Sequence, residues 1–301
     1  MTKMFGRSPL DAENASDEYH WKKNVTNKAT HAILSRCSVD EILGSSMAVE
    51  TKVKIVVEVG TTINAFQTFT SANRIITRKR ICHLLPQGFL FVSVNYRLIP
   101  QVDIMTPLQD TANAIAWIHS HIAENGGDPA RIHISGHSAG AHHVAIIGTN
   151  HPFLKAAGKD LGILKSVMVL DTQVLDVKRL IGNESLMANE RGAASYVKSF
   201  GIDEEVWSQS SPIVNVAKGK QLPPFIISYS HGTEEADTSE SRKLQADAFS
   251  QALTEAGIRN QVISATDRSH GEIKARFGTA QDDITQATMR FIESKSLNAH
   301  N

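Results

Sequence analysis

Short apolar runs alternate with stretches of helical spacing from residue 52 onward. The runs KVKIVVEV at 52–59 and FLFVSVNY at 89–96 are rich in β-branched and aromatic residues. Continuous apolar character over this length is typical of strands buried on both faces of a parallel sheet. Four more runs of strand length follow, RIHIS at 131–135, SVMVLD at 166–171, PFIISYS at 224–230 and QVISA at 261–265.

Helical patterns lie between these runs. Pro107–Asn125 repeats apolar residues at helical spacing and ends at Gly126-Gly127, a common helix stop. We expect further helices at about 69–85, 139–148, 241–256 and 280–295. Strands that alternate with helices predict one doubly wound, mostly parallel α/β sheet with helices on both faces.

Two segments depart from this alternation. Residues 1–50 are polar and weakly periodic, with one short helix expected at 38–43, and predict an N-terminal arm packed on a domain that spans 51–301. The interval 172–222 is long for a connection between two sheet strands. Such an excursion commonly forms helices above the strand ends, where ligands bind, so we interpret it as a small lid-like insertion.

Composition and charge narrow the range of partners. The 301 residues are 41% hydrophobic and 21% charged, and 31 basic residues balance 31 acidic ones. This balance gives no broad field to attract nucleic acid or an anionic membrane. Two cysteines without paired spacing, no secretory signal pattern at the N-terminus and no apolar run of membrane-spanning length favour the cytoplasm. The oligomeric state is left open, with a homodimer as one option.

The stretch GHSAG at 136–140 is the strongest chemical signal. It follows a predicted strand and precedes a predicted helix, which is the context of a nucleophile elbow. Glycines two places before and after Ser138 leave room for the tight turn, and the amide of Ala139 at the helix N-terminus can face a developing oxyanion. We therefore expect Ser138 to be a nucleophile.

A serine nucleophile needs a base and an acid to orient it. His270 lies in a loop just after the strand at 261–265, where the base of such a fold belongs. The loop after PFIISYS contains three carboxylates that could serve as the acid: Glu234, Glu235 and Asp237.

These residues resemble the α/β-hydrolase superfamily, in the branch of small carboxylesterases and kynurenine-formamidase-like enzymes. The resemblance covers about 52–293 and rests on GHSAGAH, SVNYRLIP at 93–100, the segment 108–132, SPI at 211–213, PPFIISY at 223–229 and LQADAFSQALTEAGI at 244–258. It implies an α/β-hydrolase fold and a Ser-His-acid triad. No GxGxxG follows the first strand and the sequence shows no metal-ligand cluster, so we expect neither a cofactor nor a metal.

The resemblance also ranks the acids and exposes a departure. Counting back from Gln245-Ala246 favours Asp237, counting forward from the strand favours Glu235, and Asp171 at the end of SVMVLD is a less favoured alternative. Members usually carry HGG or HGGG after the first strand, where backbone amides form the oxyanion hole. Here the segment reads VGTT, so Gly60 and Thr61 are the candidates for this role beside Ala139.

Three interpretations follow from these residues. The leading one is a serine hydrolase that cleaves an ester or amide of a small molecule through an acyl-enzyme. The second keeps the fold but assigns non-hydrolytic acid–base chemistry, an elimination or cyclisation, and the altered VGTT segment favours it. The third is a ligand-binding protein without catalysis, which the joint presence of serine, histidine and loop acid disfavours.

Overall fold

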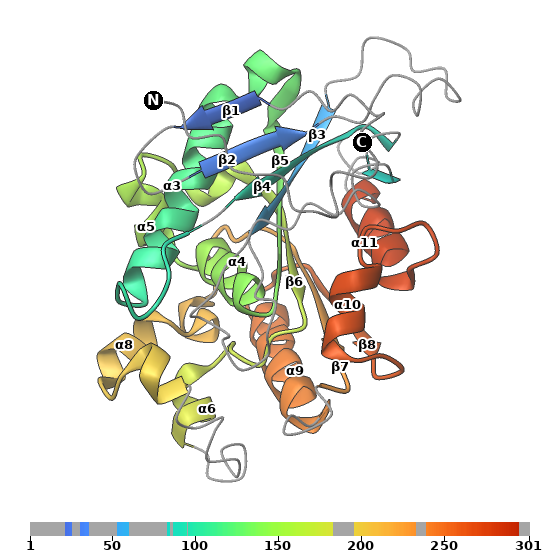
Figure 1. Cartoon of the computed structure of the whole chain (residues 1–301). Helices are drawn as coiled ribbons and strands as arrows, with labels where there is room; N and C mark the ends of the chain where they lie inside the picture. The colour runs from blue at the N-terminus through green and yellow to red at the C-terminus, as the bar shows by residue number, and fades with distance from the viewer. Residues whose placement is uncertain are drawn as a thin grey trace, which may run out of the picture.

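A central sheet organises the chain. The computed structural model describes residues 22–25, 31–35, 53–59, 83–84, 87–94, 96–182, 196–232 and 239–294. Its eight strands lie in the order β1-β2-β4-β3-β5-β6-β7-β8 (Figure 1). Their bounds are β1 (Lys22–Val25), β2 (His31–Ser35), β3 (Val53–Val59), β4 (Phe89–Val94), β5 (Gly127–His137), β6 (Leu164–Leu170), β7 (Phe225–Ser230) and β8 (Asn260–Ala265).

The six strands from β4 to β8 pair in parallel, whereas β1 and β2 extend the β4 edge with antiparallel pairing. Parallel pairing requires crossover connections, and these bring the carboxyl ends of all six strands to one edge of the sheet. Ligands of open α/β sheets bind at this edge. The topology therefore predicts a site at this edge of the sheet.

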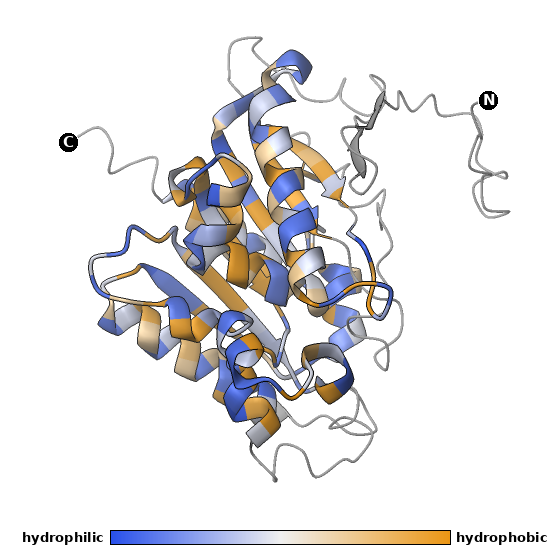
Figure 2. Cartoon of the chain, turned by 90° about the vertical axis from the view of Figure 1, so that its left-hand side faces the viewer, coloured by the Kyte–Doolittle hydropathy of each residue, from blue (hydrophilic) through white to orange (hydrophobic). Residues whose placement is uncertain are grey.

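Helices cover both faces of the sheet. The helices α3 (Met105–His121), α4 (Ala139–Thr149) and α9 (Ser239–Glu255) supply one core, and α10 (His270–Arg276) and α11 (Asp283–Glu293) supply the other. Alternate residues of β3 serve the two cores, since Ile55 and Val57 pack in the first and Val56 in the second. Figure 2 shows mostly hydrophobic strands between helices that carry hydrophilic residues as well.

Shorter helices complete the described chain. They are η4 (Ile122–Asn125), α5 (His151–Ala156), η5 (Leu161–Ile163), α6 (Val177–Gly182), α8 (Glu204–Gln209) and η6 (Pro212–Asn215). Of these, α6, α8 and η6 belong to the interval 172–222, which therefore contains helices as expected. None of the helices in the described ranges is long and apolar enough to cross a lipid bilayer.

The structure confirms the doubly wound, mostly parallel sheet. Each of the six predicted strands is present, and the predicted helices at 107–125, 139–148, 241–256 and 280–295 correspond to α3 with η4, α4, α9 and α11. The helix expected at 69–85 lies outside the described residues except for 83–84, which are helical. The helix expected at 38–43 also lies outside them. The hairpin of β1 and β2 was not predicted, because KKNV and HAILS show little apolar alternation.

Candidate active site

Two neighbouring strands bring Ser138 and Asp171 to the same edge of the sheet. His137, the last residue of β5, is paired in register with Leu170, the last residue of β6. Ser138 directly follows β5 and Asp171 directly follows β6. Because the two strands are adjacent and parallel, the two residues lie beside each other at the end of the sheet. Both have positive φ, 58° at Ser138 and 57° at Asp171, which non-glycine residues rarely adopt.

The turn at Ser138 is a strained strand-to-helix bend. Ser138 is the N-cap of α4, with φ 58° and ψ −121°. A Cβ atom on Gly136 would lie 2.1 Å from the carbonyl oxygen of Gly140, so glycine is required at position 136. Strain of this kind persists only where the surrounding structure enforces it, and it clusters at active sites. The geometry is that of a nucleophile elbow.

His270 is held by its backbone at the start of α10, five residues after β8 ends. Ser269 caps this helix in a capping box with Glu272, and the amide of His270 donates to the carbonyl of Gly232 at 3.0 Å. The imidazole is fixed at Nδ1, which donates to Oδ2 of Asp171 at 2.6 Å. The side chain is 12% exposed, so the ring lies near the surface but is mostly enclosed.

Asp171 is fully buried and has partners from three other elements. The amide and hydroxyl of Ser230 donate to its two carboxylate oxygens at 2.8 and 2.6 Å. Arg242 on α9 places Nη1 3.2 Å from Oδ1. Burial raises the pKa of Asp171, but Arg242 and His270 outweigh burial and hold it well below its usual value. The side chain is therefore an ionised carboxylate. Its negative charge stabilises His270 when the imidazole takes up a proton.

His137 packs against the imidazole ring of His270. The two ring centroids are 4.3 Å apart, and Nε2 of His137 donates to the backbone carbonyl of His270 at 2.9 Å. Nδ1 of His137 is buried without a hydrogen-bond partner among the described residues. Burial, followed by the neighbouring His270, lowers the pKa of His137 well below its ordinary value. His137 is thus a neutral side chain that supports the position of His270.

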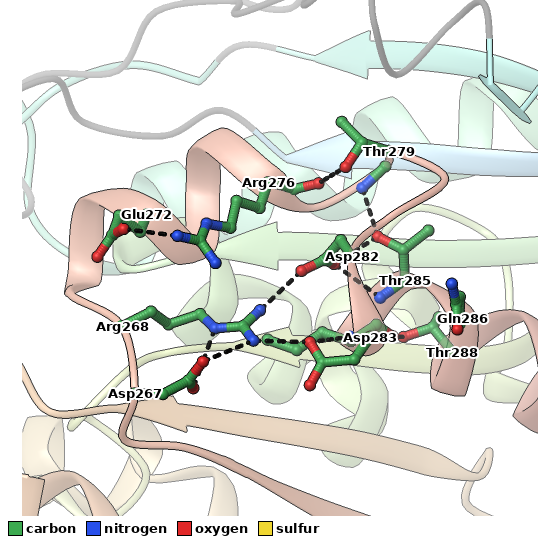
Figure 3. A network of polar contacts seen from close by, with 12 residues as sticks. Asp267, Arg268, Glu272, Arg276, Thr279, Asp282, Asp283, Thr285, Gln286 and Thr288 are labelled. Carbon is green, nitrogen blue, oxygen red and sulfur yellow. Dashed lines mark hydrogen bonds and ion pairs between the residues drawn. The ribbon is translucent and has the colours of Figure 1, made fainter.

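An ion-pair network centred on the buried side chain of Arg268 anchors the loop that precedes His270 (Figure 3). The guanidinium of Arg268 contacts Asp282 and Asp283 at the start of α11, each at 2.8 Å, and its neighbour Asp267 at 3.1 Å. Asp282 is buried and also accepts from the amide of Thr285 at 2.8 Å, which caps α11. The network therefore ties α11 to the residues that lead into α10.

The sequence-predicted residues divide into three groups. Ser138 and His270 both lie at the carboxyl edge of the sheet, and Ala139 is the first residue of α4. Asp171, the less favoured acid, is the carboxylate hydrogen bonded to His270. The favoured acids Asp237 and Glu235 and the oxyanion candidates Gly60 and Thr61 lie outside the described residues, so these assignments stay predictions.

Sequence reasoning missed three residues that contact the His270–Asp171 pair, namely His137, Ser230 and Arg242. Arg242 belongs to a polar segment of α9, where an arginine is ordinarily exposed. The only sequence signal was indirect. A carboxylate that ends a strand as apolar as SVMVLD is buried, and a buried carboxylate needs a cation or several donors.

His137, Asp171 and His270 also carry donor atoms of types that bind divalent metals, all within 4.8 Å of one another. Arg242 opposes a second cation at Asp171, since its guanidinium is permanently charged. The hydrogen bonds from His270 and Ser230 occupy Oδ2 of the carboxylate. The donor set fits a hydrogen-bonded relay better than a metal centre.

Known proteins resemble this chain in sequence and in fold. The BD-FAE family model matches residues 46–248, which include the elbow, Asp171 and Arg242. A probable isoprenylcysteine alpha-carbonyl methylesterase, ICMEL1 of Arabidopsis thaliana, is 29% identical over 206 residues, which are 63% of this chain and 40% of that protein. Esterase LipQ of Mycobacterium tuberculosis is 29% identical over 189 residues, or 61% of this chain and 42% of LipQ. This chain therefore matches well under half of the length of these two relatives.

Solved structures share the fold. Esterase Est2 of Thermogutta terrifontis superposes with a TM-score of 0.63 at 21% identity, covering 95% of this chain and 93% of Est2. Esterase B of Lactobacillus rhamnosis gives a TM-score of 0.67 at 17% identity, covering 93% and 87% of the two chains. Together with the sheet order and the family match over two thirds of the sequence, these findings show that the chain belongs to the BD-FAE family of the α/β-hydrolase superfamily.

Proposed function

We propose that this protein is a serine hydrolase that cleaves a carboxylic ester, or an amide, of a small molecule through an acyl-enzyme. One observation carries the proposal. The residue after β5 is a serine on a strained elbow, and the residue after the adjacent strand β6 is a carboxylate bonded to His270. The names of ICMEL1 and LipQ, both esterases, favour the ester.

Each group has a chemical role in this proposal. Oγ of Ser138 attacks the carbonyl carbon while Nε2 of His270 takes the hydroxyl proton. Asp171 accepts from Nδ1, so it fixes the imidazole tautomer and stabilises the imidazolium that forms. The C–O bond to the leaving alcohol then breaks, and His270 returns the proton to the alcohol. Water, deprotonated by His270, then attacks the acyl carbon, the bond from this carbon to Oγ of Ser138 breaks, and His270 returns the proton to Oγ.

The oxyanion that forms on the carbonyl needs hydrogen-bond donors. We assign one donor to the amide of Ala139, because the N-terminus of α4 carries the positive end of the helix dipole. Gly60 and Thr61 are the proposed source of a second amide. The protein is proposed to act without a cofactor or metal.

A covalent probe tests the function directly. Wild type and S138A are treated with a fluorophosphonate, and the intact mass and the labelled peptide are measured by mass spectrometry. Turnover of p-nitrophenyl acetate, butyrate and octanoate and of an N-formyl anilide is followed in parallel. We expect labelling of wild type at Ser138 alone and a loss of turnover in S138A of at least about 10³-fold.

Two outcomes would overturn the proposal. If S138A turned over the esters at the wild-type rate, Ser138 would not be the nucleophile. Absence of both labelling and turnover in folded wild type would instead favour non-hydrolytic acid–base chemistry or ligand binding at the same edge of the sheet.

A further inference from the structure

The carboxylate that contacts His270 carries a buried cation on its other oxygen. Nδ1 of His270 donates to Oδ2 of Asp171, whereas Nη1 of Arg242 lies 3.2 Å from Oδ1. The Arg242 side chain is only 6% exposed. Its Nη1 also donates to the backbone carbonyl of Asp171 at 2.8 Å. The guanidinium thus holds both the side chain and the main chain of Asp171.

This arrangement changes how strongly the carboxylate of Asp171 stabilises the protonated imidazole of His270. In a Ser-His-Asp relay the negative charge of the acid stabilises the imidazolium. Arg242 is permanently protonated, so its charge offsets part of that stabilisation across a buried carboxylate, where water screens little. A neutral imidazole is the form that accepts the proton of Ser138. The cation at this position therefore favours the neutral form of His270, which can act as the base.

We propose that Arg242 is a positioning residue that orients Asp171 and weakens the attraction of His270 for protons, so that His270 acts as a base at lower pH than with Asp171 alone. The inference rests on the proposed function. It adds to that function a residue on α9 that sets the acid limit of catalysis.

The other charged and titratable groups around His270 do not replace Arg242. From β5, His137 stays neutral because burial lowers its pKa well below the ordinary value. On α10, Glu272 is bonded to Ser269 and to Arg276. Lys274, on the same helix, contributes to lowering the pKa of His137. Among the described residues, Arg242 is the buried cation bonded to Asp171.

The pKa of Asp171 agrees with this assignment. Burial alone would raise it, and the charge of Arg242 is the largest of the opposing effects that hold it below its usual value. Asp171 therefore remains ionised over the whole range in which an imidazole titrates, and its charge does not disappear as the pH falls to 5. The acid limb of the pH profile then reports His270 and not Asp171.

The experiment compares kcat/KM for a p-nitrophenyl ester from pH 5 to pH 9 in wild type, R242Q, R242K and K243Q. R242Q removes the charge but keeps a donor for the carbonyl of Asp171. R242K keeps the charge. K243Q removes the neighbouring cation of α9, which pairs with Asp247 in solvent. We expect the acid limb of R242Q to move up by about one pH unit, and those of R242K and K243Q to stay within a few tenths of wild type.

A folding control accompanies each profile. Circular dichroism and thermal melting verify that the variants are folded, and R242M, which keeps an apolar stem, provides a second uncharged variant if R242Q melts below the assay temperature. An acid limb in R242Q or R242M that coincides with wild type overturns the inference, as does an equal upward shift in R242K. If S138A is inactive and the limb still does not move, this inference fails and the proposed function stands. Full activity of S138A would instead refute the proposed function.

Discussion

The amide nitrogen of Ser138 donates to the carbonyl oxygen of Leu170 at 3.0 Å. This bond continues the ladder between β5 and β6 by one step beyond the last paired residues, His137 and Leu170. The elbow and the strand that carries Asp171 are therefore locked together at the edge of the sheet. Any displacement of one strand end moves the other, which preserves the relative position of the proposed nucleophile and acid.

The choice of acid can be decided by three matched substitutions. D171N keeps the shape of the side chain but removes the charge and the acceptor for Nδ1–H of His270. We expect kcat/KM to fall by about 10³- to 10⁴-fold, as is usual when a triad carboxylate becomes an amide. D237N and E235Q are expected to change kcat/KM by less than about threefold. A large loss in D237N or E235Q, with an active D171N, would restore the assignment made from the family counts.

The close contact at Gly136 predicts a large cost for one methyl group. G136A places a Cβ atom 2.1 Å from a backbone oxygen of Gly140, so the elbow must shift. We expect the free energy of unfolding in urea to fall by at least about 2 kcal/mol. G182A is the control, because no atom of the described residues lies within 4 Å of the added carbon and φ is not positive, and it is expected to change stability by less than about 0.5 kcal/mol. Equal effects in the two variants would contradict the tight-turn geometry.

The ion pairs predict that Arg268 contributes much more to the free energy of unfolding than Arg276 does. R268M leaves Asp282 buried beside an uncharged side chain, which is expected to cost about 3–5 kcal/mol in the free energy of unfolding. R276M removes an exposed pair with Glu272 and is expected to cost less than about 0.5 kcal/mol. Because His270 follows Arg268 by two residues, kcat/KM of folded R268M should fall as well. A stable R268M would show that the network does not anchor α10.

Buried histidines predict a loss of stability in mild acid. Burial, the largest influence, lowers the pKa of His142 to about 4 and that of His133 to about 3. Since an unfolded histidine titrates near 6.5, the unfolded state gains protons first as the pH falls below that value. Each side chain therefore stabilises the folded state above about pH 6.5 and loses this contribution progressively as the pH falls toward its folded pKa. Between about pH 7.5 and pH 5 each should account for about 2 kcal/mol of the fall in unfolding free energy.

Urea titrations at the two pH values check this expectation. H142Q keeps a donor for the carbonyl of Ser210, which His142 contacts at 2.7 Å, but cannot titrate. The decline from pH 7.5 to pH 5 should be smaller in H142Q by about 2 kcal/mol, and smaller still in H133Q/H142Q. The same decline in wild type and in the double variant would show that these histidines do not control the acid limit of folding.

The sequence predicted the sheet well because its inner parallel strands, such as β4 and β7, are buried on both faces. Runs such as FLFVSVNY and SVMVLD are apolar almost throughout, and both contain strands of the structure. The β1–β2 hairpin was missed because its strands are only four and five residues long and contain polar residues. A local pattern does not contain the long-range pairing to β4 that defines them.

The site was predicted only as far as local patterns reach. Ser138 follows from a motif in one strand-turn-helix unit, and His270 from its place after the last strand. The contact between His270 and Asp171 joins residues 99 positions apart, and counting along a loop could not reveal it. Ser230 and Arg242 contribute only through this contact, so their roles depend on the order of β6, β7 and α9 in space.

The positive φ at Ser138 predicts that the proposed nucleophile lowers the thermal stability of the protein. A glycine at this position would relax a conformation with φ 58° and ψ −121°, and S138G should therefore melt at a higher temperature than wild type while losing its nucleophile. Directed evolution for thermal tolerance alone would enrich such inactive variants. A screen of this fold must therefore score turnover and survival in the same clone.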